Sequence, residues 1–297
     1  MTDRRIELRT VKGGGVKRML EITTAIGCPN MCKFCPQDAF LKSYHGERRL
    51  SYGDFERVIK KLPKDVLVRF SGFTEPFMNA DTVKMIKLAA EGGFRVDLFT
   101  TLVGLEESQI SELASLDLDG VVLHLPDNEE NTNIIKAGGK NYDKILALFL
   151  QKVSVTEFMT MNKNMFANNG RAGLVTEIKR KKGPFRCFDN KLKYPQFVML
   201  PNCDVVLCCM DFGLKHNLGN LLTNTFDEIE QGKKYKDIKA EQNKFSVHHT
   251  ICGECSLAEP IVKNKIRSGV MKVLNIGFKV HGQNLKEDER MDSQSRS

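Results

Sequence analysis

The alternation of apolar and polar positions predicts that strands and helices follow one another along this chain. Short runs rich in apolar and β-branched residues predict strands at 19–24, 66–70, 95–100, 120–124 and 153–158. Between them, apolar residues at helical spacing predict helices at 51–62, 81–91, 108–116 and 142–150. This alternation predicts an α/β fold with a parallel sheet, and the pattern alone does not separate a partial barrel from an open, doubly wound sheet.

Composition is that of an ordinary soluble globular protein. The chain has 297 residues, 41% hydrophobic and 28% charged, which suffices for one large α/β domain or two smaller ones. The apolar run 145–150 is far shorter than the ~20 residues that span a bilayer. The first residues lack a signal-peptide pattern, and nine cysteines then favour metal ligation in a reducing compartment over disulfides. We therefore expect a cytoplasmic protein with no membrane partner.

The net charge of +8 suggests acidic partners, but the lysines and arginines are scattered. One dense basic cluster occupies residues 179–182, and we interpret it as a solvated loop. Contact with phosphate or nucleic acid is the alternative. The charge pattern therefore indicates no clear nucleic-acid partner.

Three cysteines form the densest chemical motif, in the stretch Cys28-Pro-Asn-Met-Cys32-Lys-Phe-Cys35. Their gaps of three and two residues match neither the paired Cys-x-x-Cys knuckles of zinc sites nor the bacterial ferredoxin run. Three thiols leave one iron of a four-iron cluster open, and an open coordination position is what metal chemistry on a substrate requires. A zinc site or a chance cluster of buried thiols is the alternative.

With this spacing, and with Phe34 before the third thiol, the chain resembles the radical S-adenosylmethionine (SAM) superfamily. The resemblance implies that Cys28, Cys32 and Cys35 hold a 4Fe-4S cluster whose open iron chelates SAM. Reductive cleavage of SAM would give a 5′-deoxyadenosyl radical that abstracts a substrate hydrogen, with a flavodoxin- or ferredoxin-type protein as reductant. The resemblance also implies a partial (β/α)6 TIM-like barrel as the architecture.

Other positions carry the same resemblance in loops after the predicted strands, where parallel α/β folds bind their ligands. The stretch 71–77 resembles the Gly-Gly-Glu-Pro motif of the family, with Phe73 and Thr74 where small residues are usual. The resemblance implies that SAM is bound by this loop and by those after the next two strands. The cofactor-binding residues predicted in this way are Phe34, Gly72, Thr74, Glu75, Pro76, Thr100 and Asp127. His124 is interpreted as a structural residue in preference to a substrate contact.

A second set of cysteines surrounds a predicted β-hairpin at 195–211, with its turn near Pro201 and Asn202. This set resembles the auxiliary-cluster extension called twitch, the short form of the SPASM domain, which implies one closed 4Fe-4S cluster suited to electron transfer. The ligands so predicted are Cys187, Cys208, Cys252 and Cys255. In the family, a glycine lies five residues before the cysteine ligand of the hairpin. Cys203 occupies that glycine position, so Cys208 is the expected ligand, and Cys209 is left open as an alternative ligand. Zinc in the same four thiols is the alternative.

The predicted organisation has four parts: a lead-in at 1–17, the barrel at 18–183, the hairpin-plus-helix auxiliary domain at 184–262 and an extension at 263–297. The polar, charged tail from 286 onward predicts disorder.

The resemblance implies an oxidoreductase-like reaction, the oxidation or epimerisation of a carbinol carbon in a sugar or cyclitol. It is similar to that of the dehydrogenase acting on 2-deoxy-scyllo-inosamine, which implies that Arg171 holds the substrate hydroxyl and helps to remove its proton. A surface arginine in a Gly-rich turn is the alternative for Arg171. Maturation of a ribosomal peptide is a second function and a non-catalytic iron–sulfur or zinc protein a third. The ~17 residues before the first strand are few for a peptide-recognition domain, so we expect a small-molecule substrate.

Overall fold

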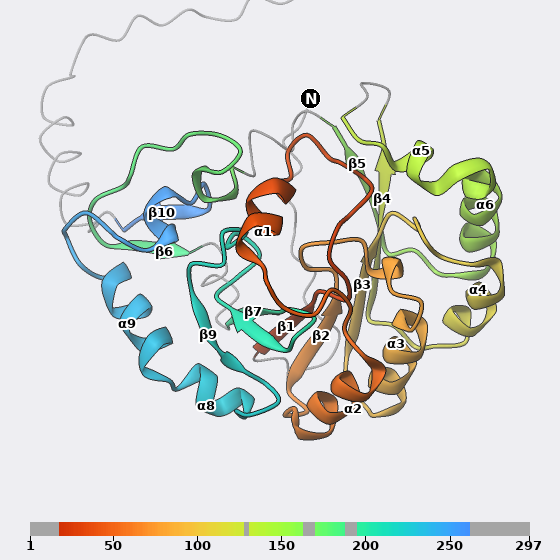
Figure 1. Cartoon of the computed structure of the whole chain (residues 1–297), viewed down its shortest axis with the longest axis horizontal. Coiled ribbons are helices and arrows are strands. Elements are labelled where there is room, and N and C mark those ends of the chain that lie inside the picture. The colour runs from red at the N-terminus through yellow and green to blue at the C-terminus, as the bar shows by residue number, and fades with distance from the viewer. Residues whose placement is uncertain (1–17, 128–130, 163–169, 188–194, 262–297) are drawn as a thin grey trace, which may run out of the picture. The chain divides into compact units, whose positions relative to one another are not determined.

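The computed structural model describes residues 18–127, 131–162, 170–187 and 195–261. In the first half of the chain, strands and helices alternate as the sequence predicts (Figure 1). The elements are β1 (Arg18–Ile22), α1 (Gln37–Ser43), α2 (Tyr52–Lys61), β2 (Val66–Phe70), α3 (Thr82–Glu91), β3 (Val96–Thr100), α4 (Glu107–Ala114), β4 (Gly120–Pro126), α5 (Ile134–Gly138), α6 (Tyr142–Lys152) and β5 (Glu157–Met161).

Helix α2 shows how local sequence sets these elements. The Ser51 hydroxyl accepts a hydrogen bond from the Asp54 backbone N–H at 3.0 Å and so caps the first turn. Phe55 and Ile59 lie four residues apart and are buried on one face. The helix ends two residues before Pro63, because a proline disfavours helical backbone at the preceding residue.

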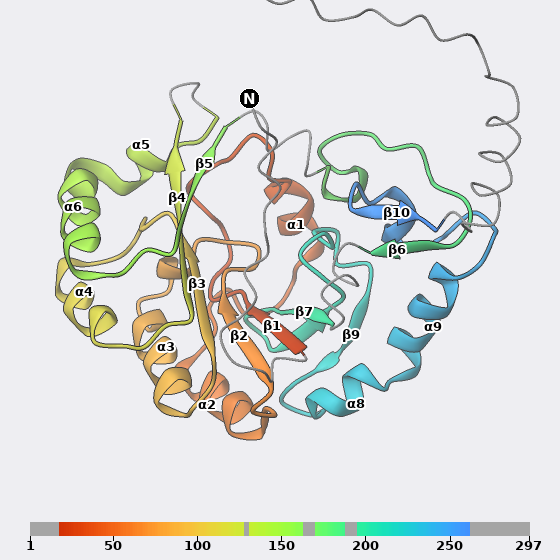
Figure 2. The ribbon, with the colours of Figure 1, turned by 180° about the vertical axis from the view of Figure 1, so that it is seen from behind.

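The second half of the chain supplies shorter elements. They are β6 (Phe185–Cys187), β7 (Gln196–Met199), β8 (Asp204–Val206), β9 (Asn217–Asn220), α8 (Phe226–Glu230), α9 (Lys233–Gln242) and β10 (Ala258–Pro260). Strands β7 and β8 pair antiparallel, which confirms the predicted hairpin. Figures 1 and 2 show α8 and α9 beside β9.

One eight-stranded sheet runs through the described residues in the order β5-β4-β3-β2-β1-β7-β8-β9. The first six of these strands are parallel, and β8 and β9 are antiparallel additions. The sixth parallel strand, β7, therefore pairs with β1 and belongs to the hairpin. Strands β5 and β9 are the two edges of the sheet, so the described residues form an open parallel α/β sheet and no closed barrel.

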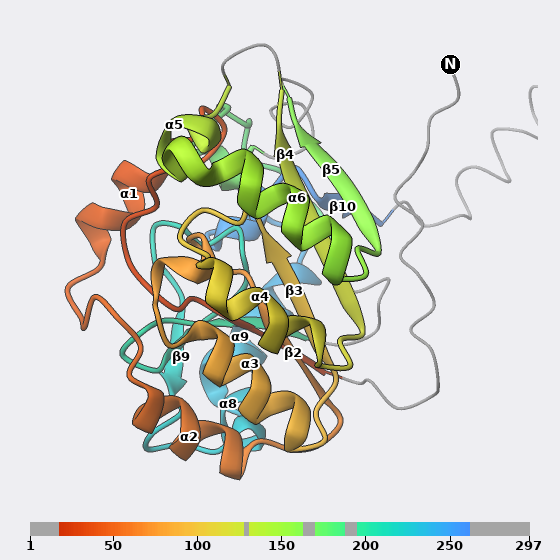
Figure 3. The ribbon, with the colours of Figure 1, turned by 90° about the vertical axis from the view of Figure 1, so that its right-hand side faces the viewer.

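Helices α2, α3, α4 and α6 cover one face of the sheet (Figure 3). Leu20, Val68 and Leu98 point into this helical layer and are fully buried. Side chains alternate between the faces of a strand, so Glu21, Arg69 and Asp97 lie on the opposite face. That second face belongs to the candidate site.

The fifth strand differs from its prediction. The sequence predicts 153–158, whereas β5 spans Glu157–Met161. Val153 is the C-cap residue of α6 and lies in the core, and Val155 packs against the core. Their apolar side chains therefore pack at the end of the helix and are not part of the strand. Strand β5 is an edge strand with exposed residues, and such strands carry a weak hydrophobic signal.

The chain divides by its contacts after Pro260. Residues 262–297, including the tail predicted to be disordered from 286, lie outside the described residues, as does the lead-in 1–17. Within the described residues, no helix has the length and apolar character that crossing a membrane requires.

Candidate functional site

The first cysteine loop follows β1 and brings three thiols together. Cys28, Cys32 and Cys35 are half-buried, and no disulfide joins any cysteine of the described chain. Burial raises the pKa of Cys28 to about 11, and nearby Cys35 and Cys28 help burial to raise the pKa of Cys32. Metal ligation requires thiolates, so a bound metal centre must displace the protons that burial retains.

Contacts from two other loops fix this cysteine loop. The Lys33 N–H donates to the Asn131 carbonyl at 3.0 Å, and the Asn133 N–H donates to the Asn30 carbonyl at 2.6 Å. The Asn30 side-chain amide donates to the Thr101 hydroxyl at 2.9 Å. The loops after β1, β3 and β4 therefore meet at the carboxyl ends of the strands, where parallel sheets bind ligands.

Glu75 links the loops after β2 and β3. Its carboxylate, 3% exposed, accepts hydrogen bonds from the Thr100 hydroxyl at 2.6 Å, from the Thr101 N–H and hydroxyl at 2.7 Å each, and from the Phe77 N–H at 3.4 Å. Burial raises the pKa of Glu75, and these four donors oppose that rise. Both carboxylate oxygens and the Thr100 hydroxyl thus have partners inside the protein. Direct contact of Glu75 and Thr100 with SAM stays a prediction.

Gly72 and Pro76 hold the β2 loop against the β1 loop. Gly72 has a φ of +75°, and a Cβ there would lie 2.2 Å from the Thr23 hydroxyl oxygen. That oxygen accepts a hydrogen bond from the Phe73 N–H at 3.2 Å. The Thr24 hydroxyl donates to the Pro76 carbonyl at 2.7 Å. Only glycine allows this close approach of the two loops.

The other predicted cofactor residues have different surroundings. Phe34 is 2% exposed and belongs to the main hydrophobic core, against which Cys32 packs. Asp127 accepts a hydrogen bond from the Asn131 side-chain amide at 2.6 Å. Asp127 therefore stabilises the segment that holds the cysteine loop, and its predicted contact with SAM stays a prediction.

Several enclosed polar atoms in and around these loops have no hydrogen-bond partner among the described residues. They include Asn30 Oδ1, Gln37 Oε1, Thr74 Oγ1, His124 Nε2, Thr132 Oγ1 and Arg171 Nε. An unpaired buried polar atom costs about 1–3 kcal/mol, so a ligand with several polar groups would be stabilised here. SAM, with its amino, carboxylate and hydroxyl groups, fits such a site.

Arg171 lies in the short 3-10 helix η3 (Arg171–Gly173) and is near both cysteine sets. Its Nη1 donates to the Cys209 carbonyl at 3.0 Å, and its guanidinium lies 4.9 Å from the centre of the Phe212 ring. Its positive charge lowers the pKa values of Cys32 and Cys35, against the larger effect of burial. Arg171 and Ala172 have φ values of 48° and 50°, a left-handed conformation that non-glycine residues rarely adopt. Residues 163–169, which precede this turn, lie outside the described residues.

The second cysteine set gathers beside α9. Burial raises the pKa of Cys208 well above its ordinary value, and Cys209, Cys252 and Cys255 add to the rise. Cys187, at the end of β6, helps to raise the pKa of the same Tyr235 hydroxyl that Cys208 and Cys252 influence. The four predicted ligands therefore lie in one neighbourhood.

Cys208 and Cys209 have different neighbours. Cys208 interacts electrostatically with Cys252 and Cys255. Cys209 instead packs against a small apolar cluster that also contacts Cys35. This arrangement favours Cys208 as the auxiliary ligand. Cys203, at the position where the family has glycine, has a φ of 64°, a conformation that glycine adopts without cost.

The basic cluster 179–182 supports this second set. Arg180 donates to Glu254 Oε1 at 2.8 Å and to the His248 carbonyl at 2.7 Å. Lys181 Nζ donates to the Cys255 carbonyl at 2.6 Å and to the Ala258 carbonyl at 2.5 Å. These two side chains bind the loop that carries Cys252 and Cys255. The interpretation of the whole cluster as a solvated loop is therefore wrong for Arg180 and Lys181.

No group of three or more His, Cys, Asp and Glu side chains within the described parts of the chain is close enough to hold a single metal ion. Cysteine thiolates are the ligands that hold iron–sulfur clusters in proteins. The chemistry of the two cysteine sets therefore fits a thiolate-bound cluster at each position.

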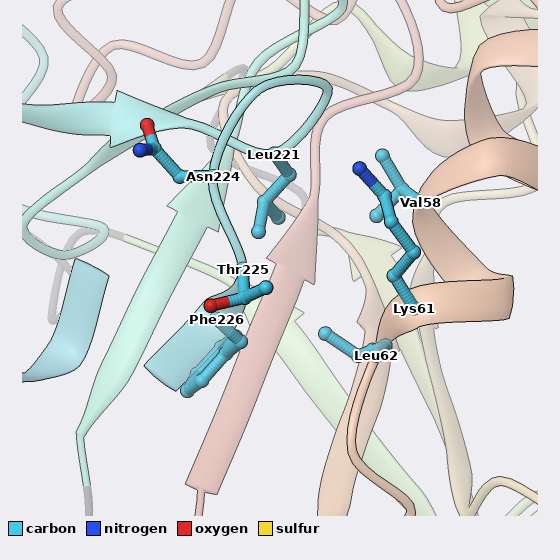
Figure 4. A pocket seen from close by; sticks show the side chains of 7 residues that line it. All are labelled: Val58, Lys61, Leu62, Leu221, Asn224, Thr225 and Phe226. Carbon is cyan, nitrogen blue, oxygen red and sulfur yellow. The ribbon is translucent and has the colours of Figure 1, made fainter. Parts of the chain in front are cut away.

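A separate depression lies between α2 and the segment before α8 (Figure 4). Its space of about 160 Å³ includes open solvent, and it is lined by Val58, Lys61, Leu62, Leu221, Asn224, Thr225 and Phe226. Ligand pockets are usually about 300–1,000 Å³, so this depression is too small for a substrate.

Three residues near the cysteines were missed by sequence reasoning. Asn30 and Gln37 line the first cysteine loop, and Gln37 Nε2 donates to the Phe73 carbonyl at 2.5 Å. Gln242 Nε2 donates to Cys252 Sγ at 3.2 Å. The position of Asn30 between two cysteines was an available signal, whereas nothing in the sequence links Gln242 to Cys252.

Comparison with known proteins agrees with this geometry. A model of the radical SAM superfamily matches residues 22–151, and a model of an iron–sulfur cluster-binding domain, SPASM, matches residues 187–256. The chain therefore contains a radical SAM domain followed by a SPASM domain. A radical SAM domain implies a 4Fe-4S cluster and SAM, and a SPASM domain implies auxiliary iron–sulfur clusters.

One curated relative is named as a peptide cyclase. The chain is similar to the PqqA peptide cyclase of Bradyrhizobium diazoefficiens, with 32% identity over 125 residues. That match covers 41% of this chain and about a third (32%) of the relative's length.

Solved structures share the fold. One is BtrN in complex with AdoMet and 2-DOIA, with a TM-score of 0.58 and 16% identity over 82% of this chain and 94% of BtrN. Another is Streptococcus suis SuiB bound to the precursor peptide SuiA, with a TM-score of 0.51 and 14% identity over 82% of this chain and 70% of SuiB. At these identities the likeness establishes the fold alone, and the substrate class is unresolved.

Proposed function

We propose that this chain is a cytoplasmic radical SAM enzyme that oxidises or epimerises a carbinol carbon in a sugar or cyclitol. Cys28, Cys32 and Cys35 would hold the SAM-binding 4Fe-4S cluster, and Cys187, Cys208, Cys252 and Cys255 would hold one auxiliary 4Fe-4S cluster. The bound cofactors would supply a 5′-deoxyadenosyl radical and a one-electron acceptor. A flavodoxin- or ferredoxin-type protein would be the reductant. The part that binds the SAM cluster would then span residues 18–183, and the part that binds the auxiliary cluster would span residues 184–262.

The observation that carries this proposal is the position of Arg171. Its guanidinium charge acts on Cys32 and Cys35, while its Nη1 contacts the carbonyl of Cys209, next to Cys208. A substrate held by Arg171 would therefore lie near both cysteine sets, where it can lose a hydrogen atom to one cofactor and an electron to the other. Arginine orients an oxygen well but stays protonated, so its role here is to bind the substrate hydroxyl.

Two kinds of support favour a small carbinol substrate. Structural similarity to BtrN extends over 94% of that chain, and BtrN was crystallised with 2-DOIA. An auxiliary cluster next to the substrate site also suits oxidation, because the substrate radical must lose an electron to become a ketone. A reaction that only returns a hydrogen atom to the substrate radical would not need to reduce this cluster.

Maturation of a ribosomal peptide is the second candidate. It is favoured by similarity to a PqqA peptide cyclase and by the fold shared with SuiB, which was crystallised with a precursor peptide. A non-catalytic iron–sulfur or zinc protein is the third candidate, and failure of the reduced, reconstituted protein to cleave SAM would support it.

Substrate-stimulated SAM cleavage separates these candidates. We would reconstitute the full chain anaerobically, reduce it and measure 5′-deoxyadenosine release with polyols, aminocyclitols and peptides. The proposal predicts that a polyol or an aminocyclitol, 2-deoxy-scyllo-inosamine among them, increases release and is converted to a ketone or an epimer. Stimulation by peptides alone would replace the proposal with peptide maturation.

A further inference from the structure

The sheet face opposite the helices carries a row of polar side chains that ends at His124. Arg69 forms ion pairs with Asp97 at 2.7 Å and with Glu21 at 3.8 Å, and it lies 4.4 Å from the centre of the Phe99 ring. Arg69 is thus paired with both carboxylates of the row. These ion-paired side chains therefore cover the sheet face beneath the loops that carry the cysteines.

His124 lies near the carboxyl end of β4, at the end of this row. Its imidazole meets the Phe99 ring edge-on, with ring centres 5.9 Å apart. Packing thus fixes the ring, yet the enclosed Nε2 has no hydrogen-bond partner among the described residues. Burial, helped by the charge of Arg171, lowers the pKa of His124 to about 4, so the imidazole is neutral at pH 7.

Arg171 presents a second unpaired atom in the same region. Its Nη1 is bound to the Cys209 carbonyl, while its enclosed Nε–H has no partner in the described chain. The guanidinium is near enough for its charge to affect His124. The site therefore offers one atom that only donates, Arg171 Nε, and one that can accept, His124 Nε2.

A hydroxyl group satisfies both atoms at once, because its oxygen accepts one hydrogen bond and its hydrogen donates another. A backbone amide carries its donor and acceptor on different atoms and would pair only one of them at the same point. A hydroxyl bound between the two side chains would therefore pair both atoms through a single oxygen, which a backbone amide would not.

We propose that His124 is a catalytic residue that, together with Arg171, binds the reacting hydroxyl of a small polyol and takes its proton through Nε2. This inference rests on the proposed function and deepens it. It gives the site a proton acceptor, which the permanently protonated Arg171 does not provide. His124 is thus more than the structural residue that the sequence analysis describes.

The step balances in atoms and electrons. The carbinol C–H hydrogen atom leaves with the 5′-deoxyadenosyl radical, and the O–H proton moves to His124 Nε2. The remaining unpaired electron passes to a one-electron acceptor of the iron–sulfur class, and the C–O single bond becomes a carbonyl. Once the electron has passed to the acceptor, the O–H group is that of a protonated carbonyl, which is strongly acidic, so even a weakly basic imidazole can accept its proton.

Two substitutions separate binding from proton transfer. His124→Gln keeps a side chain that can hydrogen-bond to the hydroxyl but does not accept a proton, whereas His124→Phe removes both functions and keeps a ring beside Phe99. His45→Asn is the control, because His45 is exposed. Each full-length protein is reconstituted and reduced, and iron content and SAM cleavage without substrate are measured first. We expect both quantities to match the unmodified protein in His45→Asn, and iron content to match it in the two His124 variants.

The assay then uses 2-deoxy-scyllo-inosamine and related polyols, with a seryl peptide as the alternative source of a carbinol. We expect His124→Gln to lower the yield of ketone per 5′-deoxyadenosine by about a hundredfold, with KM nearly unchanged. His124→Phe should also raise KM. Deuterium from the carbinol carbon should still reach 5′-deoxyadenosine in His124→Gln, which a merely structural defect would not preserve.

Each of the following outcomes would contradict a different part of the proposal. A ketone yield in His124→Gln within twofold of the unmodified protein would overturn the role of His124 and leave the proposed function standing. Stimulation by the seryl peptide alone would overturn the choice of a small polyol. If neither the polyols nor the seryl peptide stimulated the unmodified protein, the proposed function would fail, and this inference with it.

Discussion

At the scale of single residues, the candidate site depends on short contacts between loops of different strands. The Glu75 carboxylate joins the β2 and β3 loops through Thr100 and Thr101, and the Asn30 amide extends the chain of hydrogen bonds to the cysteine loop. Gly72 allows the β1 and β2 loops to approach each other. These residues position the thiols before any metal is bound.

Replacing Gly72 with Ala should disrupt this arrangement. The added Cβ would meet the Thr23 hydroxyl at 2.2 Å in a backbone conformation with φ of +75°. We expect the free energy of unfolding to fall by roughly 2–4 kcal/mol, measured by denaturant unfolding. Gly53→Ala is the matched control, since a Cβ at Gly53 in α2 meets nothing within 4 Å. Equal stability of the two variants would contradict the account of this loop.

Replacing Arg171 with Lys should impair turnover and leave both clusters in place. Lysine keeps the charge but loses the planar group whose Nη1 binds the Cys209 carbonyl and whose buried Nε has no partner among the described residues. We expect turnover of an identified substrate to fall at least about tenfold, equal to about 1.4 kcal/mol. Arg57→Lys, at a side chain that is 66% exposed, is the control. Normal turnover in Arg171→Lys would reject its role in binding.

The cysteine spacing was enough to predict that the three thiols after β1 lie close together, because residues that are near in sequence are also near in space. The spacing did not predict Asn30, Gln37 or Gln242 as neighbours of the thiols. Their partners lie in distant segments or depend on side-chain direction, as Gln242 and Cys252 show. Such contacts follow from tertiary structure and leave no local pattern.

At the scale of elements, the hairpin and the loop after α9 bring the second cysteine set together. The β7–β8 turn places Cys208 near Cys252 and Cys255. Arg180 and Lys181 bind the 3-10 helix η5 (Ile251–Glu254) and its neighbours. Buried strands such as β2 were predicted within their observed bounds. The edge strand β5 was shifted, and the three-residue strands β6 and β10 were missed because so few residues show no periodicity.

The neighbours Cys208 and Cys209 should differ in their effect on iron content. We expect Cys208→Ala to lose about half of the bound iron, because Cys208 lies near Cys252 and Cys255. Cys209→Ala should keep it. Cys203→Gly is a further control, since glycine adopts the left-handed turn at that position without strain. Loss of iron from Cys209→Ala, with retention in Cys208→Ala, would reverse the ligand assignment.

Arg180 should stabilise the auxiliary region without binding metal. Arg180→Met keeps the apolar stem but removes the hydrogen bonds to Glu254 and to the His248 carbonyl. We expect a loss of about 1–3 kcal/mol in unfolding free energy and weaker retention of auxiliary iron during chelation. Lys179→Met, at an exposed position, should change neither quantity. Identical iron retention by the two variants would contradict a supporting role for Arg180.

At the scale of the whole molecule, the site forms where distant parts of the chain meet. Local periodicity predicted a parallel α/β fold but gave no information on the pairing of β7 with β1, which joins residues about 180 positions apart. That pairing brings the hairpin and its cysteines to the same sheet as the loops that are predicted to bind SAM. Arg171 then lies near residues of both cysteine sets, and its charge acts on His124, although the sequence separates the two by 46 intervening residues.

The central claim is that two separate 4Fe-4S clusters are bound, and that only the first cleaves SAM. Iron per chain and 5′-deoxyadenosine release, measured together on reconstituted variants, test it most directly. We predict about eight irons in the unmodified chain. Replacing Cys28, Cys32 and Cys35 with Ala should leave about half and abolish SAM cleavage, whereas replacing Cys252 and Cys255 should leave about half and preserve some cleavage. About four irons in the fully reconstituted, unmodified chain, or SAM cleavage by the Cys28, Cys32 and Cys35 variant, would contradict the account.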